Sequence, residues 1–254
     1  MGARLRCRTG SGLGRQSADR RCQCVSGPDP QFRSQRADLR QSWKRLCIGF
    51  LPRAIWKIPS GGGTPSTPWI SDPLLLGNGT PFVPFGSLTP PFGANGVEFS
   101  NDGKTLFVAN TAFHQIIQIP VTAPTMTGGL PTAGTPSIFI TGINAPDGIA
   151  IDSNDNIWIC ANQEDEIVVI DNTGKVIAKL GDFEGIDPKG IVRGLLFPAS
   201  LAFSNDKSIL YVSNLTLFLP FAGAHLAIDS DWTLQVQGYT VSKLPAKIPP
   251  IAGD

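Results

Sequence analysis

Long apolar runs and recognisable nucleophile motifs are missing from this chain. No stretch of about 18 consecutive apolar residues occurs, so we predict no transmembrane helix. No G-x-S-x-G motif occurs either, which argues against the nucleophile elbow of the α/β-hydrolases. The basic first residues are not followed by an apolar segment, so no signal peptide is expected. These absences leave the localisation of the protein open.

Cysteine is scarce outside the first fifth of the chain. Four of the five Cys lie at positions 7, 22, 24 and 47, and only Cys160 lies later. One residue separates Cys22 from Cys24, where zinc and redox motifs usually have two, and no His follows nearby. We therefore expect no metal site in this part, and we interpret Cys160, in the segment IWICAN, as a small buried apolar residue.

Charge divides the chain at almost the same place. Residues 1–57 hold 13 of the 21 Lys and Arg against three Asp, a net charge of +10, and the remainder has a net charge of −9. Residues 1–45 show no helical or strand periodicity, so we predict a disordered basic segment, or sequence foreign to the fold through a wrongly assigned start. It lacks interleaved aromatics, so nucleic-acid binding is not expected. The folded part is predicted to be residues 46–254.

Three stretches repeat at a constant offset of 52 residues without a gap. They are NGVEFSNDGKTLFVAN (95–110), DGIAIDSNDNIWICAN (147–162) and ASLAFSNDKSILYVSN (199–214). Each reads as a strand, a turn rich in Asn and Asp, and a second strand. Further strands are expected at 54–58, 115–121, 136–142, 166–171 and 175–181. Four antiparallel strands in a period near 50 residues are typical of a β-propeller blade.

The fold class predicted is therefore all-β, a propeller of four-stranded antiparallel blades. About 200 residues divided by a period of 52 give just under four blades, and propellers usually close with four to eight. We expect either a small ring or part of a larger one. An open arc would leave two unpaired blade edges, through which the chain could form oligomers.

One slot differs among the copies and supplies the functional lead. It precedes each innermost strand and holds Asn95, Asp147 and Ala199. Ring closure would bring the first two to one mouth of the central channel, where an amide oxygen and a carboxylate suit Ca²⁺, and less specifically Mg²⁺, Mn²⁺ or Zn²⁺. The alternative is that Asn-Gly and Asp-Gly are ordinary turn residues.

Other polar positions are expected to be structural. An Asn recurs at the end of every copy, at 110, 162 and 214, which favours a role in building the blade. His114 is a lone histidine in a loop, and such residues usually have structural or solvated roles. The acidic segment QEDE at 163–166 is interpreted as a solvated loop.

The first two repeats resemble the SMP-30/gluconolactonase/LRE-like family, over about residues 54–245. The resemblance implies a six-bladed propeller, here lacking its N-terminal blades, that hydrolyses sugar lactones and related esters with one axial divalent ion. That ion is typically held by an early Glu, an Asn in an N-G pair and an Asp in a P-D-G triplet. The last two map onto Asn95 and Asp147, whereas the early Glu has no counterpart before Glu98.

Two hypotheses follow. In the first, the protein is a divalent-metal-dependent lactone or ester hydrolase with an incomplete site, in which Asp147, the only mapped carboxylate, is also the candidate general base. In the second, it is a non-catalytic propeller of the NHL type that binds a protein or a small ligand. Metal binding separates the two, because only the first requires it.

Overall fold

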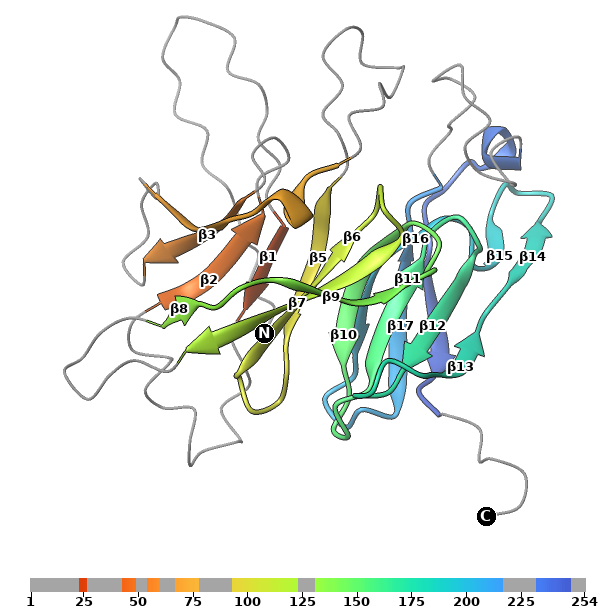
Figure 1. Cartoon of the computed structure of the whole chain (residues 1–254). Helices are drawn as coiled ribbons and strands as arrows, with labels where there is room; N and C mark the ends of the chain where they lie inside the picture. The colour runs from red at the N-terminus through yellow and green to blue at the C-terminus, as the bar shows by residue number, and fades with distance from the viewer. Residues whose placement is uncertain are drawn as a thin grey trace, which may run out of the picture.

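The computed structural model describes residues 23–26, 43–48, 54–59, 67–77, 93–122, 131–216 and 232–247. Regular structure in these ranges is β-strand, with two short 3₁₀ helices, η1 (Pro73–Leu75) and η3 (Trp232–Gln235). Figure 1 shows the strands gathered into successive small sheets. Within the described residues, no helix is long and apolar enough to cross a membrane.

Four antiparallel sheets follow one another along the chain, and their strands pair with their sequence neighbours except in the second sheet, where β9 pairs with β7. A separate hairpin, made of β14 (Phe183–Ile186) and β15 (Val192–Gly194), follows the third sheet and precedes the fourth along the chain. The first sheet consists of β1 (Gln23–Ser26), β2 (Trp43–Ile48), β3 (Ala54–Pro59) and β4 (Pro68–Ser71), and the second of β5 (Ala94–Phe99), β6 (Thr105–Asn110), β7 (Gln115–Thr122), β8 (Thr132–Ala133) and β9 (Ser137–Thr141). The third consists of β10 (Pro146–Ile151), β11 (Ile157–Ala161), β12 (Glu166–Ile170) and β13 (Val176–Leu180). The fourth consists of β16 (Pro198–Phe203), β17 (Ile209–Asn214) and β18 (Val241–Pro245).

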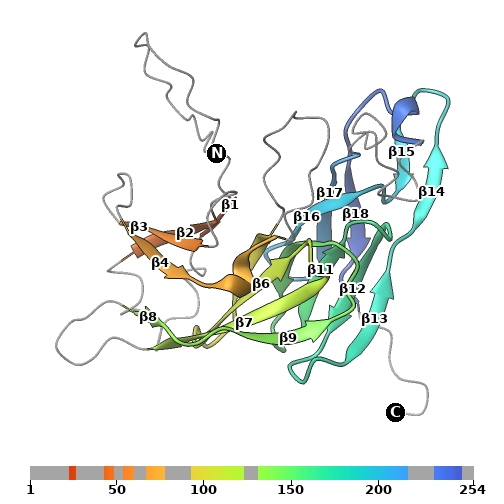
Figure 2. The same ribbon diagram turned by 45° about the horizontal axis from the view of Figure 1, so that its top comes forward.

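The first strands of the four sheets are neighbours in space. Strand β1 lies against β5, β5 against β10, and β10 against β16. The remaining strands of each sheet lead away from this row, so consecutive sheets face one another (Figures 1 and 2). This is the arrangement of propeller blades around an axis, and it confirms the all-β fold of antiparallel blades expected from the repeat. In the described residues two of the sheets have the expected four strands, the second has five and the fourth has three.

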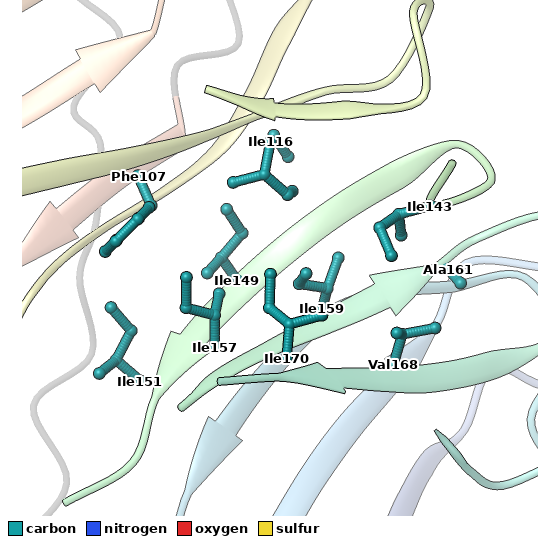
Figure 3. Packing of buried hydrophobic residues seen from close by; sticks show 11 residues of the cluster. Phe107, Ile116, Ile143, Ile149, Ile151, Ile157, Ile159, Ala161, Val168 and Ile170 are labelled. Carbon is teal, nitrogen blue, oxygen red and sulfur yellow. The ribbon is translucent and has the colours of Figure 1, made fainter. Parts of the chain in front are cut away.

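The core consists of the apolar layers between consecutive sheets. Figure 3 shows the layer between the second and third sheets, where Phe107 and Ile116 meet isoleucines of β10, β11 and β12. A second layer packs Trp158 and Cys160 against Leu210 and Val212 of the fourth sheet. Because the third sheet is covered on both faces, every residue of β10 and β11 is buried. Each large apolar side chain so buried contributes about 1.5–3 kcal/mol.

The strands expected at 54–58, 115–121, 136–142, 166–171 and 175–181 are confirmed as β3, β7, β9, β12 and β13. The hairpin β14–β15 was not anticipated. Strand β1 and part of β2 fall within residues 1–45, and the rest of that segment lies outside the described residues. Because β1 pairs with β2 and lies against β5, the predicted lack of strands does not hold for these two strands, whereas for the remaining residues of 1–45 the separation from the fold stays a prediction.

The constant offset of 52 fails at one strand. Val97 pairs with Val108, and Leu201 pairs with Val212 in the same relation. In the third sheet, Ile149 pairs with Ile159, one residue earlier than the offset requires. A slip of one residue exchanges the two faces of a strand. The gap-free alignment of β11 with β6 and β17 is therefore wrong by one position.

Candidate functional site

The three slot residues lie at equivalent places in neighbouring strands. Asn95, Asp147 and Ala199 are each the second residue of the first strand of a sheet, in β5, β10 and β16. These strands lie side by side. The structure thus brings Asn95 and Asp147 to the same end of adjacent innermost strands, as the repeat predicts.

The glycines that follow the slot allow these strands to approach closely. A Cβ added to Gly96 would lie 2.1 Å from the carbonyl oxygen of Asp147, and one added to Gly148 would lie 2.8 Å from that of Ala199. Both contacts are with backbone, which cannot move aside easily. The Asn-Gly and Asp-Gly pairs are therefore not turns, because the glycine lies inside a strand where another backbone passes.

Thr111 connects the Asn95 side chain to the next sheet. The Nδ2 of Asn95 donates a hydrogen bond to Thr111 Oγ1 at 3.1 Å. The same hydroxyl donates to the carbonyl oxygen of Pro146 at 2.8 Å. Pro146 immediately precedes Asp147, so one hydroxyl contacts one slot residue and the backbone beside the other.

Asn162 makes the equivalent connection one sheet later. Its Nδ2 lies 3.4 Å from Asp147 Oδ2 and donates to the carbonyl oxygen of Pro198 at 3.1 Å. Asp147 is 8% exposed and Asn162 is 4% exposed, so this contact is shielded from bulk water. Charged groups buried to this degree are normally held by partners of this kind.

The slip in β11 explains why Asn162 takes this place. The backbone N–H groups of Thr111, Asn162 and Leu215 donate to the carbonyls of Gly93, Ala145 and Phe197, which are spaced by 52. The donors make Asn162 the counterpart of Thr111, and not of Asn110 as the sequence alignment suggests. Asn162 therefore contacts a slot residue, and through the Pro198 carbonyl it also ties the third sheet to the fourth, as expected for a residue that builds the blade.

The other two recurring Asn do have structural contacts. Asn110 donates to the carbonyls of Leu74 and Leu76 and accepts from Phe113 N–H. Asn214 accepts from Leu196 N–H and donates to two hydroxyls of the loop before β18 and of β18 itself. These contacts tie one sheet to the loops beside it, as expected for a residue that builds the blade.

His114 and Asp165 fix the residue two places before the slot. His114 Nδ1 accepts a hydrogen bond from Ala145 N–H at 2.9 Å, and Asp165 Oδ1 accepts from Phe197 N–H at 2.6 Å. Ala145 and Phe197 have φ of 46° and 54°, a region that non-glycine residues rarely adopt. The structural interpretation of His114 agrees with this contact. Asp165 is 4% exposed, so the solvated loop expected at 163–166 does not extend to it.

The pKa of the Cys160 thiol is affected by burial and by the nearby Asp147 carboxylate. Burial raises the pKa of its thiol well above the ordinary value, and the negative charge of the Asp147 carboxylate raises it further. Its Sγ lies in the layer toward the fourth sheet, and it is fully buried. The interpretation of Cys160 as a buried apolar residue is confirmed, and its raised pKa excludes a nucleophilic thiolate at neutral pH.

The two polar slot residues carry oxygen atoms of the kind that bind divalent cations. Asp147 offers a carboxylate and Asn95 an amide oxygen, both ligands that suit a hard divalent cation. Ala199, at the third copy of the slot, offers no ligand. No group of three or more His, Cys, Asp or Glu that could hold a metal occurs in the part of the chain that the structure describes.

A family model covers the two slot residues. Residues 91–181 match the SMP-30/Gluconolactonase/LRE-like region. The region spans the second and third sheets and contains both Asn95 and Asp147, together with Thr111 and Asn162. It ends before the fourth sheet, in which the slot holds Ala199.

Curated relatives are similar over part of the chain. Lactonase drp35 of Staphylococcus saprophyticus is 32% identical over 100 residues, which are 38% of this chain and 31% of that protein. Lactonase drp35 of Staphylococcus epidermidis is 30% identical over 87 residues, 34% of this chain and 26% of that protein. The match thus spans between about a quarter and a third of the length of these lactonases.

Solved structures show lower identity. Regucalcin from Agrobacterium tumefaciens, described as a calcium-binding protein, is 23% identical with a TM-score of 0.48, over 79% of this chain and 56% of that one. A gluconolactonase from Xanthomonas campestris is 15% identical with a TM-score of 0.42, over 63% and 40%. The assignment of the fold to this chain rests on its own sheets and on the SMP-30/gluconolactonase/LRE-like region.

Proposed function

We propose that this chain belongs to a hydrolase of lactones or related carboxylic esters that depends on a divalent cation, most simply Ca²⁺. The observation that supports the proposal is that Asn95 and Asp147 are the second residues of the adjacent strands β5 and β10, within the residues that match the family model. The similarity to lactonase drp35 supports the reaction class. The substrate proposed is accordingly a small lactone or ester.

Asn95 and Asp147 are the residues proposed to hold the cation, and further oxygen ligands are needed because Ca²⁺ usually has six to eight. A bound divalent cation supplies Lewis-acid chemistry, polarising the ester carbonyl and stabilising the negative charge that forms on its oxygen. Asp147, as the one carboxylate of the pair, is also the proposed general base toward water. Asn162 keeps this carboxylate oriented through the contact with Oδ2.

The proposal is tested by ion binding and hydrolysis on the same protein. Thermal melting of the chelator-treated chain is measured with Ca²⁺, Mn²⁺, Mg²⁺ and Zn²⁺, since a ligand that binds only the folded state raises the melting temperature. Hydrolysis of a panel of lactones is followed in parallel. We expect D147N and N95A to raise, at least tenfold, the ion concentration needed to stabilise the chain against melting and to support hydrolysis. E184Q, which removes an exposed carboxylate from β14, should leave both concentrations unchanged.

The rival function makes the opposite prediction. A non-catalytic propeller that binds a protein or small ligand requires no cation. A well-folded chain whose melting temperature is the same with chelator and with each of the four ions would favour this rival. Among the described residues, Ala199 favours this rival, because its side chain has no atom that could bind a cation.

A further inference from the structure

We infer that Thr111 is a positioning residue that sets the orientation of the Asn95 amide and links it to Asp147 in the next sheet. The inference rests on the proposed function, since it concerns the same pair of ligands. Thr111 itself is not proposed to touch the cation or the substrate. Its role is to decide which atom of Asn95 is offered as a ligand.

The single proton of the Thr111 hydroxyl decides how the Asn95 amide is oriented. A hydroxyl has one hydrogen to donate, and it can accept through its lone pairs. Thr111 Oγ1 donates that hydrogen to the Pro146 carbonyl at 2.8 Å. It can therefore only accept from Asn95, which must present its Nδ2 to Thr111. The Oδ1 atom, the one that can coordinate a hard cation, is turned away from Thr111.

The spacing of the two ligands also depends on this hydroxyl. Pro146 precedes Asp147 directly, and the Gly96 Cα passes close to the Asp147 carbonyl. The Thr111 hydroxyl thus spans the gap between the strand that carries Asn95 and the backbone that carries Asp147. A change at Thr111 should move both ligands relative to each other, although neither is altered.

The link that Thr111 makes between a slot residue and the next strand is repeated one sheet later. Asn162 occupies the place of Thr111 in the next sheet, where it contacts the slot residue Asp147 and the Pro198 carbonyl. Leu215 occupies that place in the fourth sheet, where the slot holds Ala199 and no ligand needs to be oriented. A polar side chain is therefore present where the slot residue is polar, and an apolar one where it is not.

The experiment compares T111V, which keeps the shape and removes the hydroxyl, with T111S, which keeps the hydroxyl. Ca²⁺ and Mn²⁺ are titrated calorimetrically into the chelator-treated full chain. T111V should raise the Kd for the ion roughly threefold to tenfold, the effect of a lost hydrogen bond. T111S should stay within about twofold of the wild type. In the N95A background, T111V should have a smaller effect than in the wild type, because only the hydrogen bond to the Pro146 carbonyl is then lost.

A second readout works without any ion. In T111V, exchange of the Asn95 side-chain amide protons, followed by NMR, should be faster than in the wild type, and in T111S it should be restored. If the wild type binds ion and T111V binds it equally well, the inference is overturned and the proposed function stands. If the wild type binds no ion, the proposed function fails. Exchange then decides the inference alone, and equal rates in T111V and wild type overturn it.

Discussion

The close passage of β5 over β10 predicts a large effect of a single methyl group at Gly96. In G96A the new Cβ would lie 2.1 Å from the Asp147 carbonyl oxygen, where real Cβ contacts essentially never fall below 3.0 Å. The two backbones must therefore separate by about 0.9 Å. Overpacking of this kind costs about 1–3 kcal/mol. The smaller entropy of unfolded Ala relative to Gly returns about 0.4–1 kcal/mol.

The net loss in the free energy of unfolding should be about 1.3 kcal/mol, with a fall in melting temperature of about 3–5 °C for a chain of this size. The assay is urea denaturation and thermal melting followed by circular dichroism. G238A is the matched control, because its nearest neighbour is the flexible Ile191 Cδ1 at 3.1 Å, and it should change stability by less than about 0.5 kcal/mol. If G96A and G238A melt together, the close approach of the innermost strands is refuted.

Three further predictions concern single side chains. H114A should lose about 1 kcal/mol in urea denaturation because Ala145 N–H loses its acceptor, whereas H114D should recover most of it. Cys160, buried and with a raised pKa, should resist iodoacetamide in the native protein and react only on unfolding; labelling at the native rate of an exposed thiol would contradict this. The Ser204 hydroxyl and other donors lower the pKa of Asp206 to about 2, below its ordinary 3.8. Wild type should therefore melt above D206N at neutral pH and lose that lead as pH falls from 3.8 through about 2; a lead independent of pH would refute it.

Much of the fold could be predicted because the repeat is regular. The alternation around Val97 and the turns rich in Asn and Asp indicate paired strands, and a period of 52 places a sheet in each copy. The placement of Asn95 and Asp147 on adjacent innermost strands follows from the same period. The sequence could not show whether the Asn-Gly and Asp-Gly pairs are turns, because only the neighbouring backbone explains the glycine.

The slip in β11 was not visible in the sequence for a physical reason. An alternation of apolar and polar residues reveals which face of a strand is buried. The third sheet is covered on both faces, so Ile157, Trp158, Ile159 and Cys160 are all apolar and carry no such alternation. The alignment therefore matched Asn162 to the wrong position. The slip arises at the turn 152–156, which is one residue shorter than the turn of the first copy. Ile151 therefore pairs with Ile157, whereas the equivalent Phe99 pairs with Leu106, which aligns with Trp158.

The central claim is that Asn95 and Asp147 bind one divalent cation. Crystals of the full chain grown with Mn²⁺ test it directly through the anomalous signal of the ion. The account predicts a peak within coordination distance, about 2.0–2.6 Å, of both Asn95 Oδ1 and an Asp147 carboxylate oxygen. A well-ordered structure with no peak between these two side chains, or with the oxygens directed to different ends of the strands, would contradict it.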